Sequence, residues 1–291
     1  MGCELCPRRC GADRASGEVG FCRQGADLRI SRAALHPYEE PCISGDRGSG
    51  TVFFVGCTLR CLYCQNREIS RSNTAGRVLT PEELGKILLD LQEKGAHNVN
   101  FVTPTHFTDQ ILASLATVKD RLQIPVVWNT SGYERIETLQ SLEGWVDVYM
   151  PDLKYGSGEL GEKYSAAPDY TERALSAIEE MVRQTGAPLF DGDGMLRRGV
   201  LVRHLVLPSH REDSIRLLRM LAERVDPQRI LLSLMSQYTP DFAMDTPYKN
   251  LHRRLTSFEY QSVMKEAEAL GFQGYMQARS SAQKAYTPDF E

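Results

Sequence analysis

From residue 51 onward, short apolar runs alternate with longer amphipathic runs, and this alternation restricts the chain to one class of fold. The apolar runs are predicted strands at residues 51–55, 98–102, 125–129, 146–150, 200–207 and 229–234. Most of them lack polar alternation, as expected when helices cover both faces of a parallel sheet. Since a full barrel closes with eight β-α units, about six units predict an α/β fold of the partial (β/α)6 TIM-like barrel type.

The intervening runs carry helix signals. Thr80 can cap the first predicted helix, Pro81 suits its first turn, and Glu83 completes a capping box. A last helix at about residues 257–270 is expected to end at Gly271.

The alternation breaks down in the first 45 residues, which are rich in Cys, Arg and Gly. We therefore expect two parts, a Cys-rich metal-binding segment at residues 1–45 and the barrel at residues 46–291.

Composition limits the class of protein and the compartment that can be expected. Hydrophobic residues make up 42% and charged residues 25% of the chain, as in an ordinary globular protein. The net charge is −4 and the basic residues are scattered, so no clear nucleic-acid surface is expected. No apolar run approaches the roughly 20 residues of a membrane span, and the start of the chain lacks a signal-peptide core. We expect a cytoplasmic protein whose eight cysteines stay reduced and serve as ligands.

Three cysteines follow the first predicted strand with the spacing C-x3-C-x2-C. Cys57, Cys61 and Cys64 could hold a four-iron cluster and leave one iron open to a small molecule. The alternatives are zinc and unligated core cysteines. Zinc requires a fourth ligand close by, and residues 65–80 contain no Cys or His. With Tyr63 before the last cysteine, the motif resembles the signature of the radical S-adenosylmethionine (SAM) enzymes, and we expect a [4Fe-4S] cluster.

The other predicted strands also end in polar residues, and in parallel α/β barrels the chemistry collects at these ends. The segments are Thr103-Pro104-Thr105-His106, Asn129-Thr130-Ser131-Gly132, Asp152-Leu153-Lys154, Arg203-His204-Leu205 and Ser236-Gln237-Tyr238. Together with the cysteine motif they resemble the pyruvate formate-lyase activating enzymes, in the branch labelled PflX-like. The resemblance covers nearly the whole chain.

The resemblance implies that SAM binds at this rim. Tyr63 would lie against the adenine, and Lys154 would meet the carboxylate as a compact point charge. Asp152 would help hold SAM, directly or through a cation. The alternative for Asp152 and Lys154 is an exposed surface pair. Leu205, in the segment that resembles the fifth strand of the activating enzymes, is a further candidate cofactor contact.

Two departures from the activating enzymes fall in this pocket. Their Gly-Gly-Glu element is replaced by residues 103–106, so Thr103 and Thr105 are expected to contact SAM through hydroxyls and carbonyls. Asn129 stands where those enzymes have an acidic residue. His106 and His204 lie nearest the rim and are candidate acids, bases or substrate contacts, or else packing histidines.

A second cysteine group lies at the start of the chain, with the spacing C-x2-C-x3-C-x11-C. Cys3, Cys6, Cys10 and Cys22 could hold structural zinc or an auxiliary iron–sulfur cluster, or no metal, since the spacing does not choose between them. Cys42 is left over, as either a buried small apolar residue or a reactive thiol.

The expected activity follows from the resemblance. A reducing flavodoxin or ferredoxin would supply an electron, SAM would be cleaved to a 5′-deoxyadenosyl radical, and that radical would abstract hydrogen from a substrate. The leading expectation is activation of a glycyl-radical enzyme, with Lys154, His106 and His204 as candidate catalytic residues. The alternatives are a radical SAM enzyme that modifies a small molecule or another macromolecule, and a non-catalytic iron–sulfur or zinc module.

Overall fold

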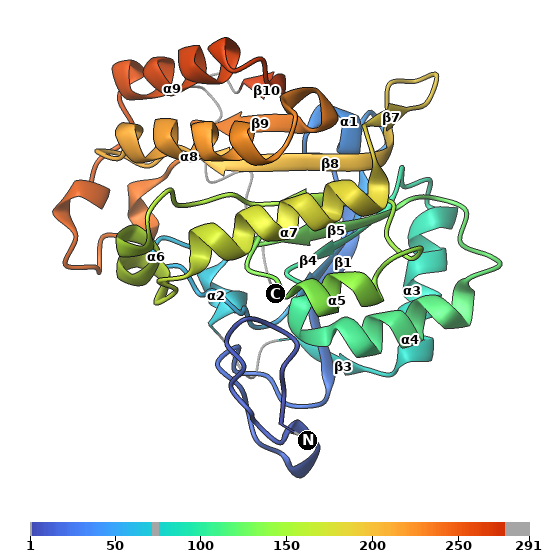
Figure 1. Cartoon of the computed structure of the whole chain (residues 1–291). Coiled ribbons are helices and arrows are strands. Elements are labelled where there is room, and N and C mark those ends of the chain that lie inside the picture. The colour runs from blue at the N-terminus through green and yellow to red at the C-terminus, as the bar shows by residue number, and fades with distance from the viewer. Residues whose placement is uncertain (1, 72–75, 277–291) are drawn as a thin grey trace.

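The computed structural model describes residues 2–71 and 76–276 and confirms the expected α/β fold built on a parallel sheet (Figure 1). The predicted strands are β2 (Ser49–Phe54), β4 (Val99–Val102), β5 (Val126–Thr130), β6 (Val148–Pro151), β8 (Leu196–Leu205) and β9 (Leu231–Met235). They lie side by side in the order β9-β8-β6-β5-β4-β2 and pair in parallel. Their carboxyl ends therefore share one rim.

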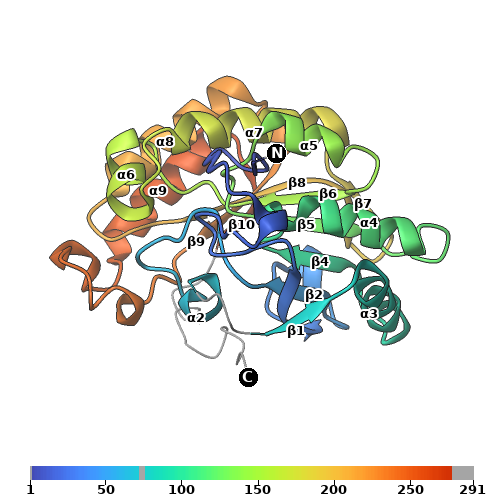
Figure 2. The ribbon, with the colours of Figure 1, turned by 90° about the horizontal axis from the view of Figure 1, so that it is seen from below.

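The longer helices cover the outer face of this curved sheet (Figure 2). They are α3 (Pro81–Glu93), α4 (Thr108–Val118), α5 (Ile136–Ser141), α6 (Gly158–Ser165), α7 (Tyr170–Thr185), α8 (Arg211–Arg224) and α9 (Ser257–Ala269). The predicted capping box is confirmed, because Thr80 and Glu83 exchange hydrogen bonds at the start of α3. None of the helices within residues 2–71 and 76–276 has the length and apolarity to cross a membrane.

The sheet is wider than predicted. β1 (Leu28–His36) pairs antiparallel with β2, and β3 (Arg77–Leu79) extends that edge, while β10 (Gln273–Met276) extends the other. A short strand, β7 (Leu189–Phe190), pairs with β8 outside this order. The division at residue 45 stays a prediction about domains, but the sheet itself begins at Leu28. Residues 2–27 form loops with one 3-10 turn, η1 (Arg14–Ser16).

Residues 41–45 lie at the end of the barrel opposite the rim. This segment contains the short helix α1 (Pro41–Ser44), and Ile43 is fully buried there among apolar side chains of β5, β6, β8 and β9. The Ile43 carbonyl also accepts a hydrogen bond from Asn98 at 2.7 Å. Cys42 is 2% exposed beside it, and burial raises the pKa of its thiol to about 11. This is the environment of a buried apolar residue, away from the rim.

We expect Ile43→Ala to destabilise the fold by about 2–5 kcal/mol, because it leaves a cavity inside the barrel. Leu189→Ala is the control, since Leu189 is 58% exposed and its loss should change stability by less than about 0.5 kcal/mol. Urea unfolding measures both. Equal midpoints for the two variants would show that the segment does not support the barrel.

Candidate functional site

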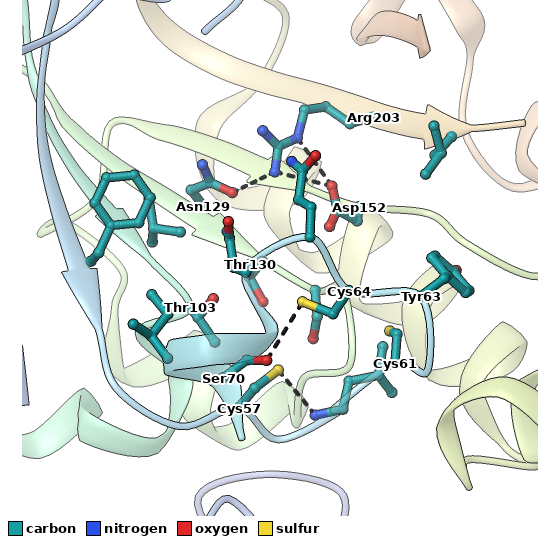
Figure 3. Close-up of a pocket in the computed structure, with 18 of the residues that line it drawn as sticks. Cys57, Cys61, Tyr63, Cys64, Ser70, Thr103, Asn129, Thr130, Asp152 and Arg203 are labelled. Atoms are coloured by element: carbon teal, nitrogen blue, oxygen red, sulfur yellow. Dashed lines mark hydrogen bonds and ion pairs between the residues drawn. The ribbon is translucent and has the colours of Figure 1, made fainter. Parts of the chain in front are cut away.

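The rim of the sheet encloses a cavity of about 220 Å³. It is lined by residues from the ends of β2, β4, β5, β6, β8 and β9, so the strand-end residues predicted from sequence do converge (Figure 3). The lining includes Cys57, Cys61, Tyr63, Cys64, Thr103, Asn129, Asp152, Lys154 and Leu205. Of the other candidate residues of the rim, Thr105, His106 and His204 do not line it.

The three cysteines of the motif lie in the loop between β2 and the short helix α2 (Arg67–Ser70). Cys57 Sγ accepts hydrogen bonds from the backbone N–H of Leu59 and of Arg60, both at 3.4 Å, and Cys64 Sγ accepts one from the Ser70 hydroxyl at 3.5 Å. Such donors favour negative charge on sulfur, which suits thiolate ligands of a cluster.

Burial alone has the opposite effect and raises the pKa of the Cys57 thiol to about 12. Metal binding is what would deprotonate such a thiol. Within the described residues, no group of three or more His, Cys, Asp or Glu side chains is arranged to hold a single metal ion. Three thiols on one cavity wall are the donor set that a four-iron cluster with one open iron requires.

Tyr63 forms one wall of the cavity and is held in place by other tyrosines. Its hydroxyl donates to the Tyr155 hydroxyl at 2.9 Å, and its ring packs edge-on against Tyr155, Tyr164 and Tyr238. These contacts fix the ring beside the cysteine loop, where it can contact a bound planar group.

Asp152 is the centre of a charged network in the cavity. Its carboxylate accepts hydrogen bonds from Lys154 at 2.7 Å and from Arg203 at 3.0 Å. Burial would raise the pKa of Asp152, but Lys154 and Arg203 hold it below its ordinary value. The Lys154 and Asp152 side chains are only 18% and 20% exposed, so the alternative of an exposed surface pair is wrong.

Arg203 extends the network to two further residues. Its guanidinium donates to Asn129 Oδ1 at 2.6 Å and pairs with Glu39 at 3.2 Å. Sequence reasoning missed Glu39, which lies far away in the chain and in no motif. Arg203 itself belongs to one of the strand-end segments named from sequence, where it is a charged residue within the mostly apolar run of residues 200–207.

A second carboxylate lies behind the cavity wall. Glu134 is 1% exposed, and its Oε1 accepts hydrogen bonds from the hydroxyls of Thr130 and of Thr105, the latter at 2.6 Å. Thr105 therefore turns toward Glu134, while Thr103 lines the cavity with a left-handed φ of 58°. Glu134 was not predicted.

The two candidate histidines hold backbone carbonyls. His106 Nε2 bonds to the Val55 carbonyl at 2.8 Å, and burial lowers its pKa to about 4. His204 Nδ1 bonds to the Leu153 carbonyl at 2.6 Å, and burial lowers its pKa too. Both rings are therefore neutral near pH 7 and fix the ends of β2 and β6.

The four N-terminal cysteines lie close to one another. A Cβ on Gly20 would be 3.0 Å from Cys10 Sγ and 3.6 Å from Cys22 Sγ, and Cys3 is hydrogen-bonded to Cys10. Burial raises the pKa of the Cys6 thiol to about 12 and that of Cys22 as well, and the backbone N–H groups of Arg8 and Gln24 offset this only in part. Slight burial would raise the pKa of Cys10, but backbone N–H groups, that of Ala12 first among them, outweigh it and lower the pKa. Within the described residues the four sulfurs are not closed around a single ion.

The chain is similar to several known proteins. Residues 51–192 match the family model described as Radical SAM superfamily. The uncharacterized protein MJ0674 of Methanocaldococcus jannaschii is 30% identical over 275 residues, which cover 91% of this chain and 74% of that protein. MJ0808 of the same organism, also uncharacterized, is 25% identical over 181 residues, which cover 57% of this chain and 52% of that protein.

A solved structure shares the fold. SuiB of Streptococcus suis, bound to its precursor peptide SuiA, has a TM-score of 0.50 and 15% identity, with 76% of this chain covered. The chain spans 46% of the length of SuiB. At this identity the likeness shows the fold alone.

Glu134 gives the fold a pH dependence that can be measured. Burial raises the pKa of Glu134 from an ordinary value of 4.5 to about 7. The contribution of this carboxyl group to the stability of the fold is therefore complete below pH 4.5 and is lost as the pH rises through 7. Glu134→Gln mimics the neutral acid. We expect it to match the wild type at pH 4.5 and to be more stable at pH 8, by on the order of 3 kcal/mol.

Urea unfolding at the two pH values tests this expectation. Glu137→Gln is the control, because its side chain is 64% exposed and should give no such gain at high pH. A Glu134→Gln variant that gains no stability relative to the wild type between pH 4.5 and pH 8 would show that burial does not raise the pKa of this carboxyl group.

Proposed function

The chain belongs to the radical SAM superfamily, and we propose that its rim cavity binds a [4Fe-4S] cluster beside one molecule of SAM. One observation carries the proposal: the three cysteines, of which Cys57 and Cys61 are buried and Cys64 is half-buried, line the same cavity as the Asp152–Lys154 pair. When bound, the cluster and SAM supply a 5′-deoxyadenosyl radical that abstracts hydrogen from a substrate. A reducing flavodoxin or ferredoxin is the proposed source of electrons.

The protein would bind, orient and shield these groups. Cys57, Cys61 and Cys64 would hold the cluster through three thiolates, which leaves room for SAM as a further ligand. Burial opposes the charge of Lys154, but Asp152 keeps the pKa of that ammonium above its ordinary value, which suits it to the SAM carboxylate. Tyr63 supplies an aromatic face for the adenine.

The remaining wall would complete the SAM site. Thr103 and Asn129 offer polar groups from β4 and β5, and Leu205 covers the cavity from β8. Thr105, His106 and His204 would support this wall from behind through the hydrogen bonds described above. Asp152 needs no additional cation to keep its charge, because Lys154 and Arg203 already bond to it.

For the substrate, we propose a glycine in the backbone of a glycyl-radical enzyme. The support is the likeness of residues 152–154 and 203–208 to the activating enzymes of that class. A second candidate is a radical modification of a small molecule or another macromolecule. It is favoured by the replacement of the Gly-Gly-Glu element, and SuiB, which shares the fold, binds a precursor peptide.

We also propose a second metal centre at Cys3, Cys6, Cys10 and Cys22. The support is the proximity of the four cysteines and the backbone N–H groups that act to lower the pKa of Cys6, Cys10 and Cys22. Zinc and an auxiliary iron–sulfur cluster both accept four thiolates.

Lys154→Ala should weaken SAM binding by about tenfold or more, because one charge-assisted hydrogen bond is lost. Iron and sulfide content should stay unchanged, since no iron ligand is removed. Lys94→Ala is the control, because Lys94 lies on the surface with its side chain 59% exposed. Titration of the reconstituted protein with SAM measures the effect, and an unchanged affinity would remove Lys154 from the SAM site.

The fate of the radical distinguishes the candidate substrates. With a glycyl-radical enzyme as partner, we expect a stable glycyl spin signal and transfer of deuterium from its Cα-labelled glycine into 5′-deoxyadenosine. If candidate partners give neither the spin signal nor the deuterium transfer, while a metabolite extract stimulates 5′-deoxyadenosine formation, the substrate is a small molecule and the activation of a glycyl-radical enzyme is wrong.

Metal analysis tests the second centre. We expect the wild-type protein to contain one zinc, or about four irons beyond those of the first cluster. Changing Cys6 and Cys22 to Ser should remove that metal and leave the cluster at Cys57, Cys61 and Cys64. Identical metal content in the wild type and the double variant would contradict the second centre.

A further inference from the structure

The N-terminal cysteine segment contacts the loop that carries Cys57, and one arginine of the segment bonds directly to that loop. Arg8 lies between Cys6 and Cys10 in the turn Cys6-Pro7-Arg8-Arg9-Cys10. Its Nε donates to the Thr58 carbonyl at 3.0 Å, and its other nitrogens donate to the carbonyls of Ser165, at 2.7 Å, and of Ala166. One guanidinium thus joins the cysteine loop to the end of α6.

Two aromatic rings hold this guanidinium in place. Its central carbon lies 3.9 Å from the ring centre of Phe21, the residue before Cys22, and 5.1 Å from that of Tyr133. The backbone of the N-terminal segment is also close to the loop, because a Cβ on Gly56 would be 2.5 Å from the Cys22 carbonyl oxygen. Arg8 therefore has a fixed position set by the segment that contains the four cysteines.

The bond from Arg8 to Thr58 reaches a sulfur of the first cysteine group. The Thr58 carbonyl and the Leu59 N–H belong to one peptide group, and that N–H donates to Cys57 Sγ at 3.4 Å. A donor on the carbonyl polarises the peptide and strengthens its N–H as a donor. Hydrogen bonds to the sulfurs are among the factors that set the reduction potential of an iron–sulfur cluster.

We propose that Arg8 is a positioning residue that connects the N-terminal cysteine centre to the catalytic cluster through the Thr58–Leu59 peptide. The inference rests on the proposed function. Arg8 touches neither SAM nor iron in this account. It orients the Thr58–Leu59 peptide, whose N–H bonds to Cys57. The metal-binding turn from Cys6 to Cys10 fixes the position of Arg8. Removing Arg8 weakens the N–H···S bond, which leaves more negative charge on the sulfur and lowers the reduction potential.

The test compares reconstituted full-length variants by redox titration of the cluster, followed by electron spin resonance. Arg8→Gln should shift the midpoint potential to a more negative value and change the spin signal of the reduced cluster. It should also speed cluster loss to a chelator by about tenfold, as expected for the loss of a charge-assisted hydrogen bond. Arg8→Lys keeps the positive charge but lacks the planar guanidinium with its several N–H donors. It should therefore not restore the midpoint potential fully.

Two other arginines of the segment serve as controls. Arg14→Gln removes a guanidinium that holds the carbonyls of Gly25 and His106, so it should lower stability without shifting the potential. Arg9→Gln changes an exposed arginine next in sequence and should change neither. Cys6→Ser should reproduce the shift in midpoint potential caused by Arg8→Gln, because without the Cys6 thiolate the turn from Cys6 to Cys10 is no longer held by the metal and Arg8 loses its fixed position.

The inference is wrong if the Arg8→Gln protein is at least as stable as the Arg14→Gln protein and its cluster has the midpoint potential of the wild type. The result for Cys6→Ser does not change that conclusion. A wild-type protein that forms no cluster at all would instead contradict the proposed function.

Discussion

The Asp152 carboxylate, with a cation on each side, is the interaction on which the rest of the cavity depends. A buried carboxylate is costly unless it is paired and hydrogen-bonded, and Asp152 meets that requirement through Lys154 and Arg203. The pairing also joins β6 to β8, where the two strands share a bridge between Asp152 and Arg203. It therefore orders the rim and fixes the Lys154 ammonium in the cavity.

The network places a cation beside the cysteine loop. Lys154 and Arg203 face the carboxylates of Asp152 and Glu39. Lys154 is the cation on the side of the cysteine loop, where Cys61 and Cys64 lie close enough to affect its pKa. A ligand that carries a carboxylate next to a cluster-binding group would match both features, and SAM is such a ligand.

Local sequence patterns predicted the parts of the fold that local rules control. The six apolar strands and the Thr80–Glu83 capping box are confirmed, and the cysteine motif, Asp152 and Lys154 do meet in one cavity because parallel strands end on one rim. The partners that sequence reasoning missed are long-range. Glu39 reaches Arg203 across 164 residues, and nothing near Glu39 indicates this contact.

Burial explains the other differences. Thr105 appeared to belong to the cavity because it follows β4, but its hydroxyl bonds to Glu134, whose depth no local pattern reveals. His106 and His204 follow or end strands as catalytic residues often do, yet both turn to backbone carbonyls. β1 was missed because residues 28–36 were assigned to the Cys-rich segment that precedes the barrel.

The central claim is that Cys57, Cys61 and Cys64 hold a cluster that cleaves SAM. The most direct measurement is formation of 5′-deoxyadenosine by protein reconstituted anaerobically with iron and sulfide, then given dithionite and SAM. The account predicts this product from the wild type, and its loss together with the cluster absorbance when the three cysteines are replaced by Ala. A triple variant that keeps either the product or that absorbance would contradict the account.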